Sequence, residues 1–235
     1  MKVALSTIGQ NVRLVRERVA KAALRAGRKP DSVVVVAAAK GVDAGRVEEA
    51  IACGIRVIGE NRVQEAAAKL SRVSLKAEWH MIGHLQTNKV KKALEIFSTI
   101  QSVDSLHLAR EISRRAERMK KEAGVFIEVN TSGEPTKFGV EPDRLVDVLE
   151  EAMKLPYVKI IGLMTVALFS DDPESVRPCF RLLRDLKMRC LDRFEDAVDM
   201  QYLSMGMSND FETAIEEGSN VVRIGTAIFG PRHYN

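Results

Sequence analysis

Residues 33–41 read VVVVAAAKG, so seven apolar residues run directly into a lysine and then a glycine. Four consecutive valines are typical of a strand that is buried on both faces, as the strands of parallel sheets are. Lys40 at the end of this strand allows two interpretations. It can mark the point where the strand reaches the protein surface, or it can be a buried amine retained for covalent chemistry.

Seven further apolar runs have the length of strands, and segments with apolar residues three and four apart separate them. Eight strand–helix units within 235 residues favour a closed parallel barrel over an open sheet. A helical pattern over residues 11–25 precedes the first strand. We therefore predict an α/β fold, a single (β/α)8 TIM barrel with an extra N-terminal helix, forming one domain over residues 1–235. The predicted strands cover residues 33–39, 56–59, 78–82, 98–103, 125–129, 159–164, 200–204 and 221–224.

Glycines, prolines and capping residues predict where several helices begin and end. The helix that includes Ala109 is expected to end at Gly124. Asp172 and Pro173 are expected to open another helix as its cap and its first-turn proline. A further helix is expected to begin at Ser208, whose hydroxyl would cap it.

The composition is that of an ordinary globular protein, with 46% apolar and 29% charged residues. No apolar run is long enough to cross a bilayer. The three cysteines have no C-x-x-C spacing, which argues against a disulfide framework or structural zinc and favours a reducing, cytoplasmic location. The net charge is only +4, and basic clusters such as residues 89–92 fall on predicted helix faces, so no nucleic-acid partner is expected.

Polar residues follow the predicted strands at their carboxyl ends, where barrels of this kind carry functional residues. Residues 202–210, YLSMGMSND, leave the seventh strand through a glycine and reach Ser208 at a predicted helix start. Residues 222–230, VRIGTAIFG, place Gly225 and Thr226 directly after the eighth strand. Loops after strands seven and eight often hold a phosphate group, so we predict a phosphate site here.

A phosphate site on the same barrel mouth favours the covalent interpretation of Lys40. Burial among valines, with Arg223 nearby, would lower the pKa of the amine from about 10.4 and let it condense with an aldehyde as a Schiff base. A lysine, a phosphate site and an arginine match the aldehyde, phosphate and ring nitrogen of pyridoxal 5′-phosphate. Because guanidinium only donates hydrogen bonds, Arg223 would keep the ring nitrogen unprotonated and make the ring a weak electron sink.

Six motifs carry a resemblance to a known family: AAAKG at 37–41, IGENRVQEA at 58–66, WHMIGHLQTNK at 79–89, EVNTSGEPTKFG at 128–139, LSMGMSNDFETAI at 203–215 and VRIGTAIFG at 222–230. The chain resembles the pyridoxal phosphate homeostasis proteins, whose fold is similar to the barrel domain of alanine racemases. The resemblance implies a Schiff base at Lys40 and an Arg223 that faces the pyridine nitrogen. It further implies a phosphate site of Ser208, Gly225 and Thr226, and a pocket lined by Ser204, Met207 and Asn61.

The resemblance also implies a protein that binds pyridoxal phosphate in vitamin B6 homeostasis without established catalysis. Family members often carry serine-lysine-threonine where this chain has Ala39, Lys40 and Gly41. The expected partners are the cofactor itself and, transiently, apo-enzymes that use it. No nucleic acid, membrane or metal is expected, and the chain is expected to be a monomer.

Two other functions remain open from the residues alone. A racemase-like enzyme would need His80, His84 or Asp104 to carry a proton at the cofactor. An aldolase without a cofactor would use Lys40 to attack a sugar directly. A metal site at the two histidines is disfavoured, because Gly83 and the strand end break the i, i+4 helical geometry that pairs such ligands.

Overall fold

The valine run forms β1 (Val34–Ala38), and its side chains alternate between two apolar environments. Val34 and Val36 pack inside the barrel, whereas Val33 and Val35 pack against the layer between strands and helices. The computed structural model describes residues 7–168, 170 and 172–231. Because the valines pack on both sides of β1, both faces of this strand are covered, as the sequence predicts.

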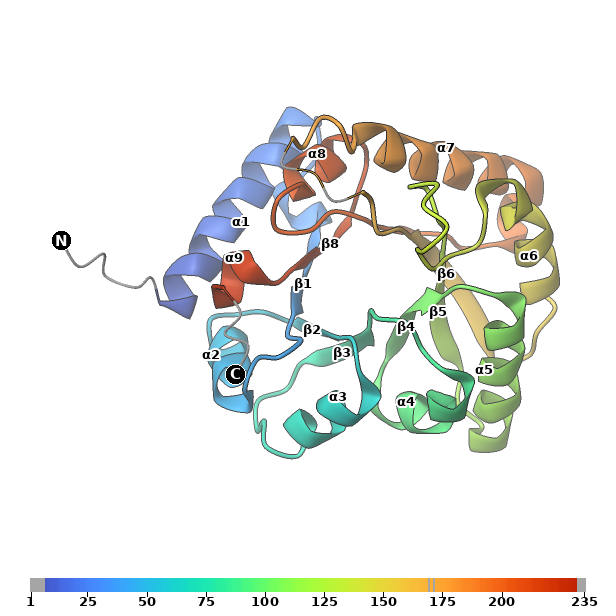
Figure 1. Cartoon of the computed structure of the whole chain (residues 1–235), viewed down its shortest axis with the longest axis horizontal. Helices are drawn as coiled ribbons and strands as arrows, with labels where there is room; N and C mark the ends of the chain where they lie inside the picture. Colours follow the sequence, from blue (N-terminus) through green and yellow to red (C-terminus); the bar gives the residue numbers. More distant parts are fainter. Residues whose placement is uncertain (1–6, 169, 171, 232–235) are drawn as a thin grey trace.

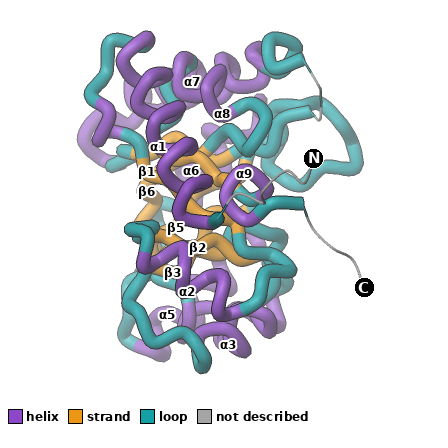
Figure 2. The backbone as a smooth tube through the Cα atoms, turned by 90° about the vertical axis from the view of Figure 1, so that its left-hand side faces the viewer, coloured by secondary structure: helices purple, strands orange, loops and turns teal. Residues whose placement is uncertain are grey.

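Eight parallel strands close into a barrel in chain order, and β8 completes it by pairing with β1. Figure 1 shows the ring of strands with helices around it, and Figure 2 shows the strands enclosed in the middle of the molecule. The predicted TIM barrel is confirmed. The remaining strands are β2 (Val57–Glu60), β3 (Glu78–Met81), β4 (Thr99–Val103), β5 (Ala123–Glu128), β6 (Val158–Met164), β7 (Tyr202–Ser204) and β8 (Val221–Ile224).

The extra N-terminal helix is α1 (Ile8–Arg25), and it lies across α8 and α9 on the outside of the barrel (Figure 1). Ion pairs from Arg18 to Glu212, at 2.8 Å, and from Arg25 to Glu216, at 2.9 Å, join α1 to α8. The other helices are α2 (Ala44–Ala52), α3 (Val63–Leu70), α4 (Val90–Ile96), α5 (Leu106–Met119), α6 (Leu145–Ala152), α7 (Arg177–Phe194), α8 (Phe211–Glu216) and α9 (Thr226–Phe229), with short 3-10 turns at Pro30–Ser32, Thr87–Lys89, Pro142–Arg144 and Glu195–Ala197.

Two of the predicted helix boundaries, at Gly124 and at Asp172 and Pro173, are wrong. Helix α5 ends at Met119 because Lys120 adopts a left-handed conformation with φ of 50°, and Gly124 belongs to β5. Helix α7 begins at Arg177 with Pro178 in its first turn, so Pro173 lies in the preceding loop. Helix α5 thus ends at a lysine and not at a glycine, and α7 begins at a later proline than the one predicted.

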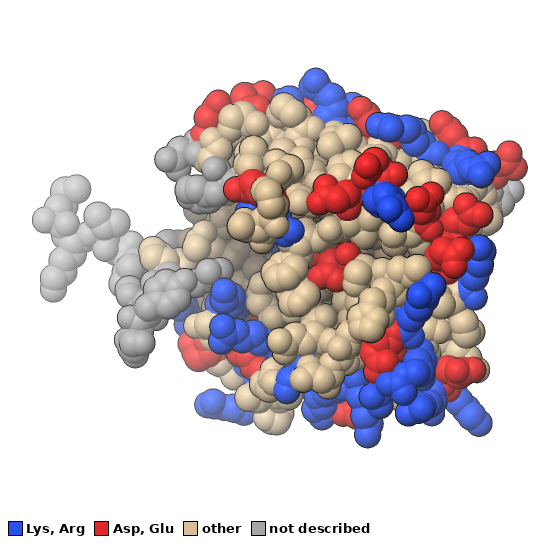
Figure 3. Space-filling view, turned by 45° about the vertical axis from the view of Figure 1, so that its right-hand side comes forward, with Lys and Arg blue, Asp and Glu red and all other residues tan. Residues whose placement is uncertain are grey.

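The barrel interior is apolar in one part and polar in another. Its apolar part contains Val36, Val57, Phe126, Met164 and Val221. Within the described ranges, no helix combines the length and the apolar character that a membrane span requires. On the face shown in Figure 3, Lys and Arg side chains are interspersed with Asp and Glu, so this face has no uniform basic surface.

Candidate functional site

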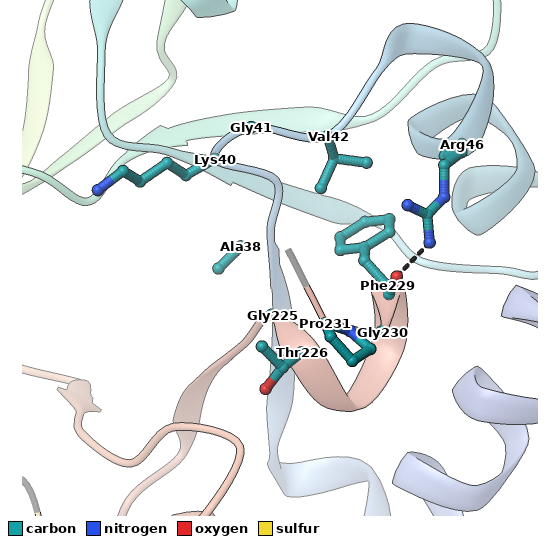
Figure 4. Close-up of a pocket in the computed structure, with 10 residues that line it drawn as sticks. All are labelled: Ala38, Lys40, Gly41, Val42, Arg46, Gly225, Thr226, Phe229, Gly230 and Pro231. Carbon is teal, nitrogen blue, oxygen red and sulfur yellow. Dashed lines mark hydrogen bonds between the residues drawn. The ribbon is translucent and has the colours of Figure 1, made fainter. Parts of the chain in front are cut away.

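Lys40 lies two residues beyond the end of β1, and its side chain is half-buried. The expectation of an amine buried among valines is therefore wrong, because the valines end before the barrel mouth. Lys40 lines a cavity of about 90 Å³ together with Gly225 and Thr226. In Figure 4 its side chain points away from the end of this cavity where Arg46 bonds to the Phe229 carbonyl.

A second cavity, of about 280 Å³, is bordered by five of the predicted site residues: Met207, Ser208, Arg223, Gly225 and Thr226. It shares Ala38, Gly225 and Thr226 with the cavity of Lys40, so the two cavities adjoin. Its volume is close to the lower end of the range for small-molecule pockets, about 300 Å³. Strand ends β1 and β8 and the loop after β7 therefore converge on one concave site.

The loop after β7 is held in place by a glycine and by two polar side chains. Gly206 has φ of +93°, and an added Cβ would lie 2.8 Å from the Phe211 Cα. The Met207 N–H donates to Asp210 Oδ1 at 2.5 Å. Ser208 Oγ accepts from the Ala227 N–H at 3.2 Å. The predicted helix start at Ser208 is thus wrong: α8 begins at Phe211, and the serine contacts the start of α9 instead.

Arg223 is buried inside the barrel, with only 4% of its surface exposed. Its Nη1 donates to Ser204 Oγ at 2.6 Å, and its Nη2 donates to the Thr165 carbonyl at 2.7 Å. Burial lowers the pKa of Arg223 to about 10, while the nearby charge of Glu128 opposes the shift. The guanidinium is therefore charged at neutral pH. The two bonds use two of its five N–H donors, which leaves donors for an acceptor in the cavity.

A chain of hydrogen bonds runs from Arg223 across the barrel to β3. Ser204 Oγ donates to Gln101 Oε1 at 2.6 Å, and Gln101 Nε2 donates to His80 Nδ1 at 2.8 Å. Because arginine can only donate, the direction of every bond in the chain follows. His80 must accept at Nδ1, so its ring is neutral, and burial lowers its pKa as well. Ser204 thus holds the Arg223 guanidinium in place through a hydrogen bond. It does not itself line either of the two adjoining cavities.

Asn61 borders a different cavity, of about 530 Å³, which Lys40 and His84 also line. There His84 Nδ1 lies 2.7 Å from Asp104 Oδ2, and the His84 ring stacks on Phe138 with centroids 3.9 Å apart. Lys40 therefore separates two spaces, one with Gly225 and Thr226 and one with the His84–Asp104 pair. Among the described residues, no three His, Cys, Asp or Glu side chains gather as metal ligands would.

Comparison with known proteins identifies the family. Residues 3–233 match the family model for the alanine racemase N-terminal domain. The chain is 47% identical to the pyridoxal phosphate homeostasis protein of Aquifex aeolicus (strain VF5), over 94% of this chain and 96% of that protein. The chain belongs to the pyridoxal phosphate homeostasis protein family.

Solved structures agree with the family membership. A crystal structure of a protein from Bifidobacterium adolescentis is 39% identical, with a TM-score of 0.89 and 94% of each chain covered. The structure of PipY of Synechococcus elongatus PCC7942 with PLP bound is 34% identical, with a TM-score of 0.81, covering 92% of this chain and 100% of that one. The barrel is therefore the fold of this family.

Sequence reasoning missed three buried groups around Arg223. They are Gln101, which continues the hydrogen-bond chain, the Thr165 carbonyl, and the Glu128 carboxyl. Burial raises the pKa of Glu128 to about 7, although the charge of Arg223 opposes the rise. Strand alternation could have found two of them, because Gln101 and Glu128 are polar residues within apolar strands.

Proposed function

We propose that this protein binds pyridoxal 5′-phosphate through a Schiff base to Lys40. The observation that carries the proposal is that two cavities adjoin. Lys40 lines one of them, Ser208 and Arg223 border the other, and Gly225 and Thr226 line both. Ser208, Gly225 and Thr226 would hold the phosphate, and Arg223 would donate to the pyridine nitrogen. The family's relatives are named for pyridoxal phosphate homeostasis, and the PipY structure contains PLP, which supports the same ligand here.

The chemistry of attachment is balanced without another reactant. The neutral amine nitrogen of Lys40 bonds to the aldehyde carbon, and the aldehyde oxygen leaves as water. Reversal by water releases the cofactor unchanged. When bound, the cofactor supplies an electron-withdrawing ring, whose power depends on the protonation of its nitrogen.

We further propose that the protein carries the cofactor in vitamin B6 homeostasis and has no demanding carbanion chemistry. Arg223 supports this proposal, because its charged guanidinium faces the cavity and cannot accept a proton from the ring nitrogen. The racemase-like alternative rests on the His84–Asp104 pair beside Lys40. Solvent deuterium incorporated at the α-carbon of an added amino acid would distinguish it from a carrier.

Transfer of the cofactor to apo-enzymes by a cytoplasmic monomer is also part of the proposal. All three cysteines are free thiols, which is typical of proteins in a reducing compartment. The exposed large apolar side chains of the described residues are spread over several elements, for example Leu14 and Leu24 on α1, Leu70 on α3 and Met188 on α7. Such scattered residues do not form the continuous apolar patch of a stable interface.

The test of the proposed function is covalent trapping of pyridoxal phosphate. The purified protein should gain a visible absorption band with the cofactor, and borohydride should bleach it and leave a pyridoxyl group on Lys40. Lys40→Ala should fold normally but retain about tenfold less cofactor or worse, because the covalent bond is lost. Lys89→Ala, a lysine of the neighbouring cavity, is the matched control and should behave like the wild type. Full retention by Lys40→Ala would contradict the proposal.

A further inference from the structure

A cluster of three titratable side chains, two of them buried, lies beside the backbone of Lys40. Lys69 on α3 is 7% exposed, and Glu60 at the end of β2 is fully buried. Lys69 Nζ lies 2.6 Å from Glu60 Oε1 and 2.7 Å from Glu65 Oε1. Glu65 and Lys69 lie four residues apart on α3, a spacing that is common for ion pairs on exposed helix faces. The burial of Lys69 shows that this pair has another role.

The cluster bonds to the peptide groups on both sides of Lys40. Lys69 Nζ donates to the Ala39 carbonyl at 2.5 Å, and the Gly41 N–H donates to Glu65 Oε1 at 2.6 Å. The first group belongs to the peptide bond that enters Lys40, and the second belongs to the one that leaves it. Since both peptide planes are anchored, the direction in which the Lys40 side chain leaves the backbone is set by α3.

The contact of Lys69 with Glu60 would by itself connect α3 to β2. The other hydrogen bonds of the cluster are not needed for that connection. All three N–H donors of the Lys69 ammonium are used, one of them on the Ala39 carbonyl. Gly41 begins the turn after Lys40 with φ of +72°, a conformation that its bond to Glu65 helps to hold. Lys69 therefore directs one of its three hydrogen bonds, and Glu65 one of its two, at the peptide groups that flank Lys40.

We propose that Glu65 and Lys69 are positioning residues that orient Lys40 for covalent capture of an aldehyde held by its phosphate group at β7 and β8. This inference rests on the proposed function. The residues proposed to bind the phosphate lie on other elements, so loss of the hydrogen bonds from Glu65 and Lys69 to the peptide groups beside Lys40 should leave phosphate recognition intact. Misplacement of a reacting group by about 1 Å can slow a reaction about a hundredfold, so a smaller shift of the Lys40 amine should reduce covalent capture about tenfold.

The experiment compares two ligands on Glu65 variants. Pyridoxine 5′-phosphate has no aldehyde and reports phosphate recognition alone, whereas pyridoxal 5′-phosphate reports recognition and capture together. Glu65→Ala should bind the first ligand as the wild type does and capture the second about tenfold less, measured by absorbance and by borohydride trapping on Lys40. Glu65→Gln keeps an oxygen that can accept from the Gly41 N–H, and it should restore part of the capture.

Glu65 is the better test residue because its side chain is 26% exposed, while Lys69→Met would leave the Glu60 carboxylate buried without its partner. Glu48→Ala is the matched control, since Glu48 also accepts a backbone N–H, from Ser74 at 2.9 Å, but has no contact with Lys40. Unchanged capture by Glu65→Ala, or equal loss of both ligands, would overturn the positioning role. Absence of a Lys40 adduct in the wild type would overturn the proposed function itself.

Discussion

Arg223 determines what the interior of this barrel can do at the scale of single residues. It is buried yet charged at neutral pH, and it is held by Ser204 and the Thr165 carbonyl. Loss of either hydrogen bond would leave the buried charge of Arg223 with fewer partners. The free-energy cost of such an unsatisfied buried group exceeds the net stabilisation that one hydrogen bond contributes. In the proposed site, a guanidinium held by these two bonds would donate to the ring nitrogen of the cofactor without transferring a proton.

Glu128 gives a stability prediction that depends on pH. Burial raises its folded-state pKa to about 7 from 4.5, so the folded protein binds this proton more tightly than the unfolded chain. Its favourable contribution is therefore complete below about pH 4.5 and is lost as the pH rises through 7. Glu128→Gln stays neutral at every pH. It should lie within about 1 kcal/mol of the wild type at pH 5 and exceed it by up to about 3 kcal/mol in free energy of unfolding at pH 8.

Urea unfolding at intervals between pH 5 and 8 measures this difference. Glu122→Gln is the control, because Glu122 is exposed just before the same strand. Its effect on the free energy of unfolding is subtracted from that of Glu128→Gln at each pH. A constant difference between Glu128→Gln and the wild type across the interval would show that the carboxyl does not change protonation there.

The loop after β7 gives a prediction at the scale of elements. Gly206 combines φ of +93° with a close approach to α8, where an added Cβ would lie 2.6 Å from the Ala214 Cβ. Gly206→Ala should therefore push the loop from α8, lower the free energy of unfolding by about 1–3 kcal/mol and weaken pyridoxal phosphate binding. Chemical unfolding and a cofactor titration measure both effects.

Gly27→Ala separates the two causes in that experiment. Gly27 also has positive φ, of 67°, but nothing lies within 4 Å of an added Cβ. Its replacement should cost only the backbone strain, about 1 kcal/mol, and leave cofactor binding unchanged. If both variants lose the same stability and retain the same affinity for pyridoxal phosphate, the close approach of Gly206 to α8 does not position Met207 and Ser208.

Cofactor binding should stabilise the whole molecule, because the proposed site would join the end of β1 to the ends of β7 and β8. At a free concentration about 100 times the dissociation constant, a ligand of the folded state adds about 2.7 kcal/mol. For a chain of this size that corresponds to a rise in Tm of roughly 5–10 °C. Thermal unfolding with and without pyridoxal phosphate measures it. Lys40→Ala should show a much smaller rise, and an unchanged Tm in the wild type would contradict the proposed binding.

The sequence by itself determined the barrel and the convergence of its strand ends. Apolar runs, helical periodicity and chain length are local properties, and eight buried strands of this kind have few ways to cover both faces. The sequence predicts Lys40, Gly225 and Thr226 as site residues because they follow such runs, Arg223 because it lies near the end of one, and Ser208 because it lies in the loop after another. The sequence was less reliable at helix ends, where Pro173 and Pro178 give the same local signal.

Only the tertiary structure decided which polar side chains face the interior and what they bind. Lys69 and Leu70 are neighbours on α3, yet the lysine is 7% exposed and the leucine 39%. Ser208 caps no helix of its own and instead meets Ala227, and Gln101 meets Ser204 across the barrel. These contacts join residues far apart in the chain. Their pairing depends on barrel closure and not on any local pattern, because a buried polar group takes the partner that the fold brings within hydrogen-bond distance.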